Sequence, residues 1–154
     1  MIEYISGPVA ELTPTYAVID CHGIGYLLNI TLPAFTALEG QTQARLLVHE
    51  VIREDTHQLF GFINEQERSL FRLLLGVSGV GANTARMILS SIPAPELEGV
   101  IISGDHLKLK NVKGIGTKTA QRVIVDLRDK IKPSGDTLFI QTESTSEVFE
   151  EALA

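Results

Sequence analysis

The 154-residue sequence is 44% hydrophobic and 21% charged, a globular composition that excludes a disordered or collagen-like chain. Its single cysteine, Cys21, excludes an internal disulfide and any zinc site built from several cysteines. The sequence has no signal-peptide pattern, and no apolar run approaches the roughly 18 residues of a membrane span, so we expect a cytoplasmic protein.

The net charge of −6 hides an uneven distribution along the chain. Residues 1–64 carry seven acidic side chains against two arginines, and residues 133–154 carry five acidic side chains and no basic one. Residues 105–132, by contrast, carry eight lysines and arginines against three aspartates. Because salt screens charges beyond about 10 Å, a ligand responds to the local charge. The basic segment is therefore compatible with a nucleic-acid partner.

Residues 1–63 have the composition and spacing of short β-strands. β-Branched and aromatic residues are concentrated in five stretches separated by turns, at residues 1–5, 16–20, 25–32, 44–52 and 58–63. Five short strands in a segment of this length favour a small closed barrel over an open sheet with exposed edges. We therefore expect residues 1–63 to form a five-stranded β-barrel.

The hydrophobic period changes at Asn64, and residues 64–132 have the pattern of an all-α domain. Asn64 followed by Glu67 is typical of a helix N-terminus. Apolar residues then recur at helical spacing, at Leu70, Phe71, Leu74 and Leu75. Further short helices follow, joined by glycine turns, with Asp105 as the predicted N-cap of one of them. The predicted fold class is α+β, a barrel followed by helices.

The helical segment contains an internal repeat. Residues 79–85 read GVGANTA, and 35 residues later residues 114–120 read GIGTKTA. Each copy follows an apolar helix and opens another. A helix N-terminus has unpaired N–H groups and a partial positive charge, and the two glycines let the backbone approach a ligand closely. The repeat therefore predicts two anion sites.

The alternative interpretation is a pair of ordinary helix–helix turns with capping glycines. Repetition at a fixed spacing, with Lys113, Lys118 and Arg122 beside the second copy, favours phosphate binding. The spacing does not fit the Gly-rich loops of nucleotide-binding proteins. The pattern is that of the helix-hairpin-helix motif, which contacts the phosphate backbone without reading bases. The predicted DNA-binding residues are Gly79, Val80, Gly81, Asn83, Thr84, Gly114, Ile115, Gly116, Thr117, Lys118, Thr119 and Arg122.

The order of these motifs resembles the RuvA family, whose members bind four-way (Holliday) junctions in the bacterial branch-migration machinery. The resemblance runs from Met1 to about Lys132. It rests on both hairpins and on Met1-Ile2, Gly7, Gly23-x-Gly25-Tyr26, Val51–Asp55, Leu59–Phe62 and Gln66–Phe71. It implies an OB-fold barrel over residues 1–63 and a tandem helix-hairpin-helix domain over residues 64–132.

The resemblance also implies partners and a cellular role. The expected assembly is a homotetramer on junction DNA, with either one tetramer or two enclosing the junction. The RuvB ATPase would supply the motor activity, and the RuvC resolvase is a further partner implied by the family. The expected role is in homologous recombination, DNA repair and the SOS response, with no catalytic residue, cofactor, metal ion or membrane contact in this chain.

Glu54 and Asp55 lie between two predicted strands, at the expected tip of a hairpin. From the residues alone, the simplest interpretation of the pair is a solvated turn. The other interpretation is a metal-binding nuclease pair, but no third carboxylate lies nearby in the sequence. The resemblance places the pair at the family's acidic pin. There the carboxylates would repel phosphates at the centre of the junction and keep the crossover open.

The sequence departs from the family in two places. Asn83 and Thr117 stand where the family commonly has lysines, which reduces the basic charge of the hairpins. Residues 133–154 are predicted to be an acidic flexible linker followed by the start of a third, RuvB-binding domain, most of which we expect to be missing.

Two other functions remain open on the sequence. The first is a helix-hairpin-helix DNA repair enzyme, a glycosylase or a nuclease. The second is a binding module without junction selectivity, which binds duplex DNA generally or uses its hairpins only for dimerisation. The four histidines, His22, His49, His57 and His106, lack metal-ligand spacing.

Overall fold

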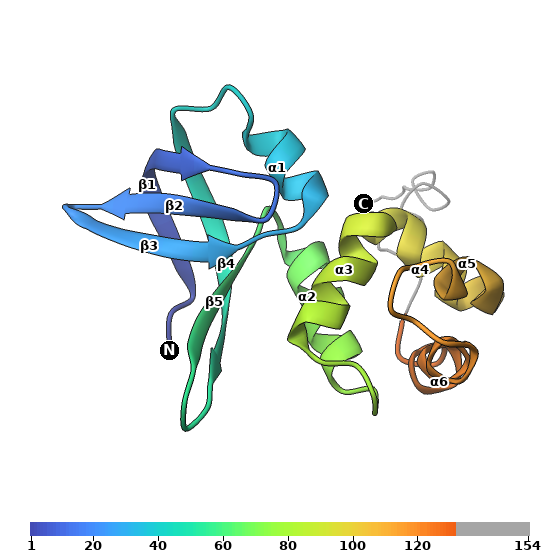
Figure 1. Cartoon of the computed structure of the whole chain (residues 1–154). Helices are drawn as coiled ribbons and strands as arrows, with labels where there is room; N and C mark the ends of the chain where they lie inside the picture. Colours follow the sequence, from blue (N-terminus) through green and yellow to red (C-terminus); the bar gives the residue numbers. More distant parts are fainter. Residues whose placement is uncertain (132–154) are drawn as a thin grey trace, which may run out of the picture.

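The computed structural model describes residues 1–131, and the predicted linker and third-domain start lie outside them. The first half of this range is a closed barrel of β1 (Tyr4–Leu12), β2 (Tyr16–Cys21), β3 (Ile24–Asn29), β4 (Gln43–Ile52) and β5 (His57–Phe62). The strand order is β1-β2-β3-β5-β4, and β1 pairs with β4 to close the barrel (Figure 1). The expected five-stranded OB-fold barrel is confirmed.

The barrel closes least tightly between β3 and β5. These two strands are parallel and pair only at Asn29 and Phe60, where the Asn29 side chain donates a hydrogen bond of 3.2 Å to the Leu59 carbonyl. The barrel core is filled by Ile5, Ala17, Ile19, Leu28, Ile30, Leu46 and Val48, together with Ala34 and Leu38 of α1 (Leu32–Leu38).

The prediction for the barrel was wrong at α1 and β1. Residues 25–32 were expected to be one strand, but β3 ends at Asn29 and α1 begins at Leu32. Thr31 is the N-cap of α1, since its hydroxyl accepts a hydrogen bond from Ala34 N–H, and a proline occupies the first turn.

The first strand was expected to end at Ile5 and instead runs to Leu12. Gly7 and Pro8, which are usually strand breakers, lie inside it. A Cβ on Gly7 would collide with the backbone carbonyl of Asp20 on β2, so this position requires glycine. Because Gly7 has no side chain, β1 can continue past this position while β2 lies close beside it.

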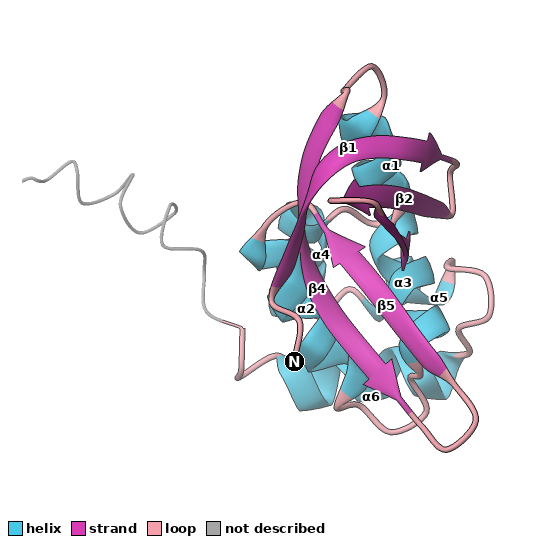
Figure 2. Ribbon diagram, turned by 90° about the vertical axis from the view of Figure 1, so that its left-hand side faces the viewer, coloured by secondary structure: helices cyan, strands magenta, loops and turns pink. Residues whose placement is uncertain are grey.

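The second half consists of α2 (Glu65–Leu75), α3 (Ala82–Ser91), α4 (Ala94–Ser103), α5 (His106–Lys110) and α6 (Thr117–Leu127). The predicted caps are confirmed: Asn64 Oδ1 accepts a hydrogen bond of 2.9 Å from Glu67 N–H, and Asp105 Oδ1 accepts one of 3.2 Å from Lys108 N–H. Figure 2 shows the barrel strands in front of the helices.

Two residues of β5 pack into the core of the helical half, whereas the barrel interior forms a separate cluster. Phe60 and Phe62 of β5 pack against Phe71 of α2, with ring centroids 5.2 and 4.8 Å from Phe71. All three rings are buried and belong to the cluster that fills the helical half. The orientation of α2 on the barrel is therefore set by packing and not by a flexible connection.

Polar contacts fix the same interface. The Arg68 side chain of α2 is buried, and its Nη1 donates to the carbonyls of Glu3 (3.0 Å) and Val48 (3.2 Å). From α3, Arg86 Nη1 donates to the carbonyls of Ile30 (3.2 Å) and Thr15 (3.4 Å). These hydrogen bonds attach α2 and α3 to the barrel. The Glu3 and Thr15 carbonyls also accept the N–H groups of Val48 and Ile30, so the arginines give each of them a second hydrogen bond.

Glu67 of α2 is a buried acid in the interface. Its carboxylate accepts hydrogen bonds from the Thr31 hydroxyl (2.6 Å) and from Ile63 N–H (3.3 Å). Burial raises the pKa of the Glu67 carboxyl, and the two hydrogen bonds offset only part of that effect. The folded protein therefore holds the Glu67 proton more tightly than the unfolded chain does.

We expect Glu67→Gln to flatten the decline in stability with rising pH. A carboxyl whose pKa is higher in the folded state stabilises the fold at low pH, and this contribution is lost as the pH rises above about 4.3, its usual unfolded value. The free energy of unfolding from urea titrations at pH 4 to 7.5 measures the effect, with the exposed Glu39→Gln as control. Parallel pH curves for Glu67→Gln and the parent would contradict it.

Candidate nucleic-acid interface

The two copies of the sequence repeat form two turns of the same geometry. The first turn joins α2 to α3, and the second joins α5 to α6. Gly79 and Gly114 have φ angles of +92° and +89°, a region that favours glycine. Val80 N–H donates to the Val77 carbonyl, and Ile115 N–H donates to the Val112 carbonyl, both at 3.0 Å. The repeat therefore specifies a backbone conformation.

The apolar residue between each pair of glycines anchors its turn. Val80 and Ile115 are each 6% exposed and belong to the helical core. Both were predicted to bind DNA, but their side chains face the core, so only their backbone is available to a ligand. Their role at the surface is to hold the flanking glycines in place.

The second glycine of each copy begins a helix without a side-chain cap. Gly81 and Gly116 are the N-caps of α3 and α6, and neither has a side chain to accept an N–H of the first turn. A Cβ on either glycine would meet no described atom within 4 Å, so the space in front of the N–H groups is open. An uncapped N-terminus with an open approach suits an anion.

The two turns lie side by side. A Cβ on Gly79 would be 3.7 Å from Thr119 Oγ1, so the first turn contacts the start of α6. Thr84 and Thr119 are half-buried, whereas Asn83, Thr117 and Lys118 are exposed or nearly so. Two turns that are 35 positions apart in sequence are thus brought into contact in the fold.

Basic charge is concentrated on the second hairpin. Lys118 and Arg122 are exposed on α6, where they line a groove of about 340 Å³ together with Gln121, Val125 and Asp126. Lys113 is exposed in the turn itself. By contrast, Lys108 of α5 forms an ion pair of 2.5 Å with Glu96. Lys113, Lys118 and Arg122 are thus exposed cations at or near the N-terminus of α6.

The predicted acidic tip projects from the barrel. The loop Arg53–Thr56 joins β4 to β5, and Arg53 N–H donates a 2.8 Å hydrogen bond to the Thr56 carbonyl. This bond leaves Glu54 and Asp55 exposed at the end of the hairpin. In Figure 1 the loop and the α2–α3 turn both point to the lower edge of the molecule, so the acids and the first hairpin share one side.

A groove of about 360 Å³ lies between the acidic tip and the first hairpin. The tip contributes Arg53, Asp55, Thr56 and Gln58, and the hairpin contributes Gly81, Ala82, Asn83 and Thr84. The sequence analysis identified the acids and the hairpin separately and did not identify Arg53 as a site residue. The only feature of the sequence that could have indicated a role for Arg53 was its position next to Glu54 and Asp55.

Below the tip, Glu50 braces the hairpin. Its carboxylate accepts a hydrogen bond from Ile2 N–H (2.8 Å) and contacts His57 Nε2 (2.9 Å). The bonds from Ile2 and His57 lower the pKa of the Glu50 carboxyl. The base of the β4–β5 hairpin is therefore attached to the N-terminal residues of the chain.

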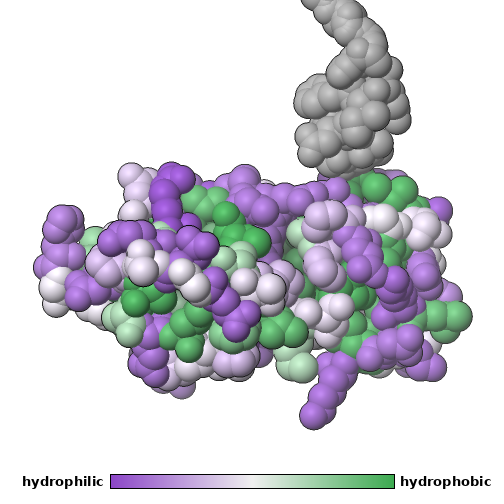
Figure 3. Space-filling view, turned by 90° about the horizontal axis from the view of Figure 1, so that it is seen from above, coloured by the Kyte–Doolittle hydropathy of each residue, from purple (hydrophilic) through white to green (hydrophobic). Residues whose placement is uncertain are grey.

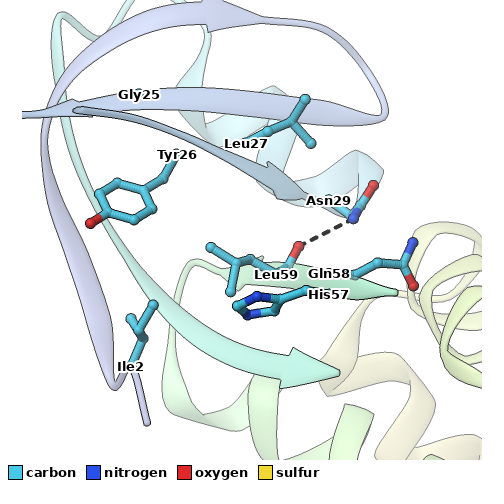
Figure 4. Close-up of a pocket in the computed structure, with 8 residues that line it drawn as sticks. All are labelled: Ile2, Gly25, Tyr26, Leu27, Asn29, His57, Gln58 and Leu59. Atoms are coloured by element: carbon cyan, nitrogen blue, oxygen red, sulfur yellow. Dashed lines mark hydrogen bonds between the residues drawn. The ribbon is translucent and has the colours of Figure 1, made fainter. Parts of the chain in front are cut away.

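A separate cavity of about 450 Å³ lies between β3 and β5 (Figure 4). It is lined by Ile2, Gly25, Tyr26, Leu27, Asn29, His57, Gln58 and Leu59, none of which was predicted to bind DNA. The Asn29 amide already bonds the Leu59 carbonyl there. The cavity follows from the single pairing between these strands and does not connect the hairpins.

The face seen in Figure 3 differs from the candidate interface. Hydrophobic residues on it occur in small groups separated by hydrophilic ones. Within residues 1–131, no helix is long and apolar enough to cross a membrane. The same part of the chain contains no group of three or more His, Cys, Asp and Glu side chains placed to hold a metal ion.

The fold and the paired turns define a barrel protein with a tandem helix-hairpin-helix domain. Residues 1–61 match the RuvA N terminal domain, and residues 71–129 match the SAM-like Helix-hairpin-helix tandem. These matches cover most of the described residues and leave residues 62–70, which include the first part of α2, between them.

Similar proteins share one name, "Holliday junction branch migration complex subunit RuvA". That of Bacteroides thetaiotaomicron is 52% identical over 163 residues, which cover 100% of this chain and 81% of the relative. That of Parabacteroides distasonis is 53% identical over 157 residues, which cover 100% and 80%. That of Bacteroides fragilis is 58% identical over 132 residues, which cover 86% and 66%. The chain belongs to the RuvA family.

We expect the two glycines of the second turn to respond differently to alanine. Gly114→Ala places a side chain at φ +89° and should lower the free energy of unfolding by about 1–2 kcal/mol. Gly116 has φ −87° and open space around its Cβ position, so Gly116→Ala adds no backbone strain and should cost less than about 1 kcal/mol, the loss expected because alanine is a poorer N-cap than glycine. Urea unfolding of both variants tests this, and equal losses would show that the turn geometry is not the cause.

Proposed function

We propose that the chain binds four-way DNA junctions through their phosphate backbone, as a non-catalytic scaffold of a branch-migration complex. The observation that carries the proposal is the pair of uncapped helix N-termini, side by side and facing open space. Backbone N–H groups with nearby cations bind phosphates without reading bases. Binding should therefore be independent of sequence.

The acidic tip supports selectivity for a branched structure. Glu54 and Asp55 lie on the same side of the molecule as the first hairpin, with only a groove between them. A continuous duplex held by the hairpins and running past the tip would bring its phosphates against these carboxylates, and like charges at short distance repel. DNA strands that diverge at the crossover of a junction carry their phosphates away from the carboxylates and avoid that repulsion.

We further propose the assembly and partners. The chain would act in the cytoplasm as a homotetramer, one or two of which hold the junction, so that each copy engages one arm. The RuvB ATPase would dock through a region C-terminal to the helix-hairpin-helix domain and supply the motor activity, and the RuvC resolvase would act on the bound junction. The relatives' names, which include a branch-migration complex, support this partnership.

Binding to a junction should greatly exceed binding to a linear duplex of the same sequence. Fluorescence anisotropy with both DNAs measures the ratio of the two affinities, and native mass spectrometry counts the copies of the chain on the junction.

The salt dependence of binding should decrease when Lys118 is removed. Every neutralised phosphate contributes about 0.9 to the slope of the logarithm of the binding constant against the logarithm of the salt concentration. Lys118→Ala in four copies should therefore reduce the magnitude of that slope by up to about four.

Lys130→Ala, an exposed lysine beyond the end of α6, is the matched control for Lys118→Ala. Equal affinity for junction and duplex would overturn the scaffold proposal. Base excision or strand cleavage by the protein would favour the repair-enzyme alternative instead.

Neutralising the tip should reduce selectivity without abolishing binding. Glu54→Gln combined with Asp55→Asn removes the repulsion, so junction binding should stay equal or tighten while duplex binding improves more. Glu39→Gln combined with Asp129→Asn makes the same change in charge at exposed positions elsewhere. An unchanged junction-to-duplex ratio at low salt would mean that the acids are only a solvated turn.

A further inference from the structure

The two hairpins have the same backbone but not the same supply of cations. The second has three exposed basic residues, Lys113, Lys118 and Arg122. Residues 76–91, which include the first turn and α3, contain a single basic residue, Arg86. The residue at the position equivalent to Lys118 is Asn83.

Arg86 is not available to a ligand of the first hairpin. Its Nη1 donates to the carbonyls of Ile30 and Thr15, on the barrel side of α3. Its Nε is buried without a hydrogen-bond partner among the described residues. Releasing the guanidinium would leave the Ile30 carbonyl without its hydrogen bond, whereas the Thr15 carbonyl would keep its bond from Ile30 N–H. The loss at Ile30 opposes movement of Arg86 to the surface. Residues 76–91 therefore offer a phosphate no free cation, and Arg72 at the end of α2 is hydrogen-bonded to His49 of the barrel.

Arg53 stands across the groove from this hairpin. Its side chain is exposed, and within residues 1–131 it forms no ion pair and no side-chain hydrogen bond. The hydrogen bond from Arg53 N–H to the Thr56 carbonyl holds its backbone at the base of the tip. The groove of about 360 Å³ has Arg53 on one wall and Gly81, Asn83 and Thr84 on the other.

We propose that Arg53 supplies the missing cation, so that a DNA phosphate in this groove is bound by the first hairpin and by the barrel together. The inference rests on the proposed function and names a further residue for it. A guanidinium binds phosphate oxygens by two parallel hydrogen bonds, which suits a group that reaches across a gap. Asp55, on the same wall, repels the phosphate and confines it to the side of the groove near Arg53 and the N-terminus of α3.

Arg53→Ala tests this role. At moderate salt the affinity for a synthetic four-way junction should fall about ten-fold or more, and the slope of log K against log salt should decrease by up to about four in a tetramer. The matched control is Arg45→Ala, which removes an exposed barrel arginine that stacks on Tyr4 with its guanidinium 4.2 Å from the ring centroid. Arg45→Ala should stay within about two-fold of the parent, and thermal unfolding verifies that both variants fold.

Moving the cation to the other wall provides a second test. Asn83→Lys places a lysine on α3 at the position equivalent to Lys118. If Arg53 and residue 83 serve the same phosphate, Asn83→Lys should restore more affinity in the Arg53→Ala background than it adds to the parent. Equal gains in both backgrounds would overturn the inference.

The outcomes separate this inference from the proposed function. If Lys118→Ala flattens the salt dependence while Arg53→Ala behaves like Arg45→Ala, the hairpins bind DNA and the role of Arg53 is wrong. If the parent protein does not bind the junction at all, the proposed function fails, and the role of Arg53 fails with it.

Discussion

The position of α2 on the barrel determines where every part of the candidate interface lies. Arg68 is buried in that contact and donates to the carbonyls of Glu3 and Val48. A buried guanidinium is costly unless its hydrogen bonds are made, so small shifts of α2 are penalised strongly. Phe71, one turn further along, packs on Phe60 and Phe62 of β5. Since β5 also carries the acidic tip and α2 leads into the first turn, one helix sets the distance between acids and hairpin.

Attraction and repulsion are combined within a short distance on this surface. In the proposed function, the uncapped starts of α3 and α6, with Lys118 and Arg122, would attract phosphates, whereas Glu54 and Asp55 would repel them. The net charge of −6 would not predict DNA binding, because the acids of the barrel and of residues 133–154 together outweigh the bases of residues 105–132. The local arrangement matters more, since screening limits each charge to its neighbourhood. Selectivity for a branched DNA would then depend on whether the phosphates of the bound DNA can stay away from the carboxylates of Glu54 and Asp55.

Local signals predicted most of the fold. The helix caps at Asn64 and Asp105 were predicted because a capping side chain acts within one turn. Four of the five strands were located, but α1 was missed, although Thr31 and a following proline are a helix start. The extension of β1 through Gly7 could not be predicted, because the need for glycine arises from the backbone of Asp20, on another strand. One error therefore had a non-local cause, whereas the miss at α1 was a local helix start that was not recognised.

The sequence by itself determined the repeat, the turn geometry and the presence of an acidic hairpin tip, since glycine conformation, helix starts and strand alternation depend on neighbouring residues. Only the tertiary structure decided which side chains serve that surface. It directs Arg86 into the barrel and places Arg53 across a groove from Asn83. The positions of these two arginines depend on how the closed barrel packs against α2 and α3. That packing results from many contacts between residues that are distant in sequence, so no local sequence pattern predicts it.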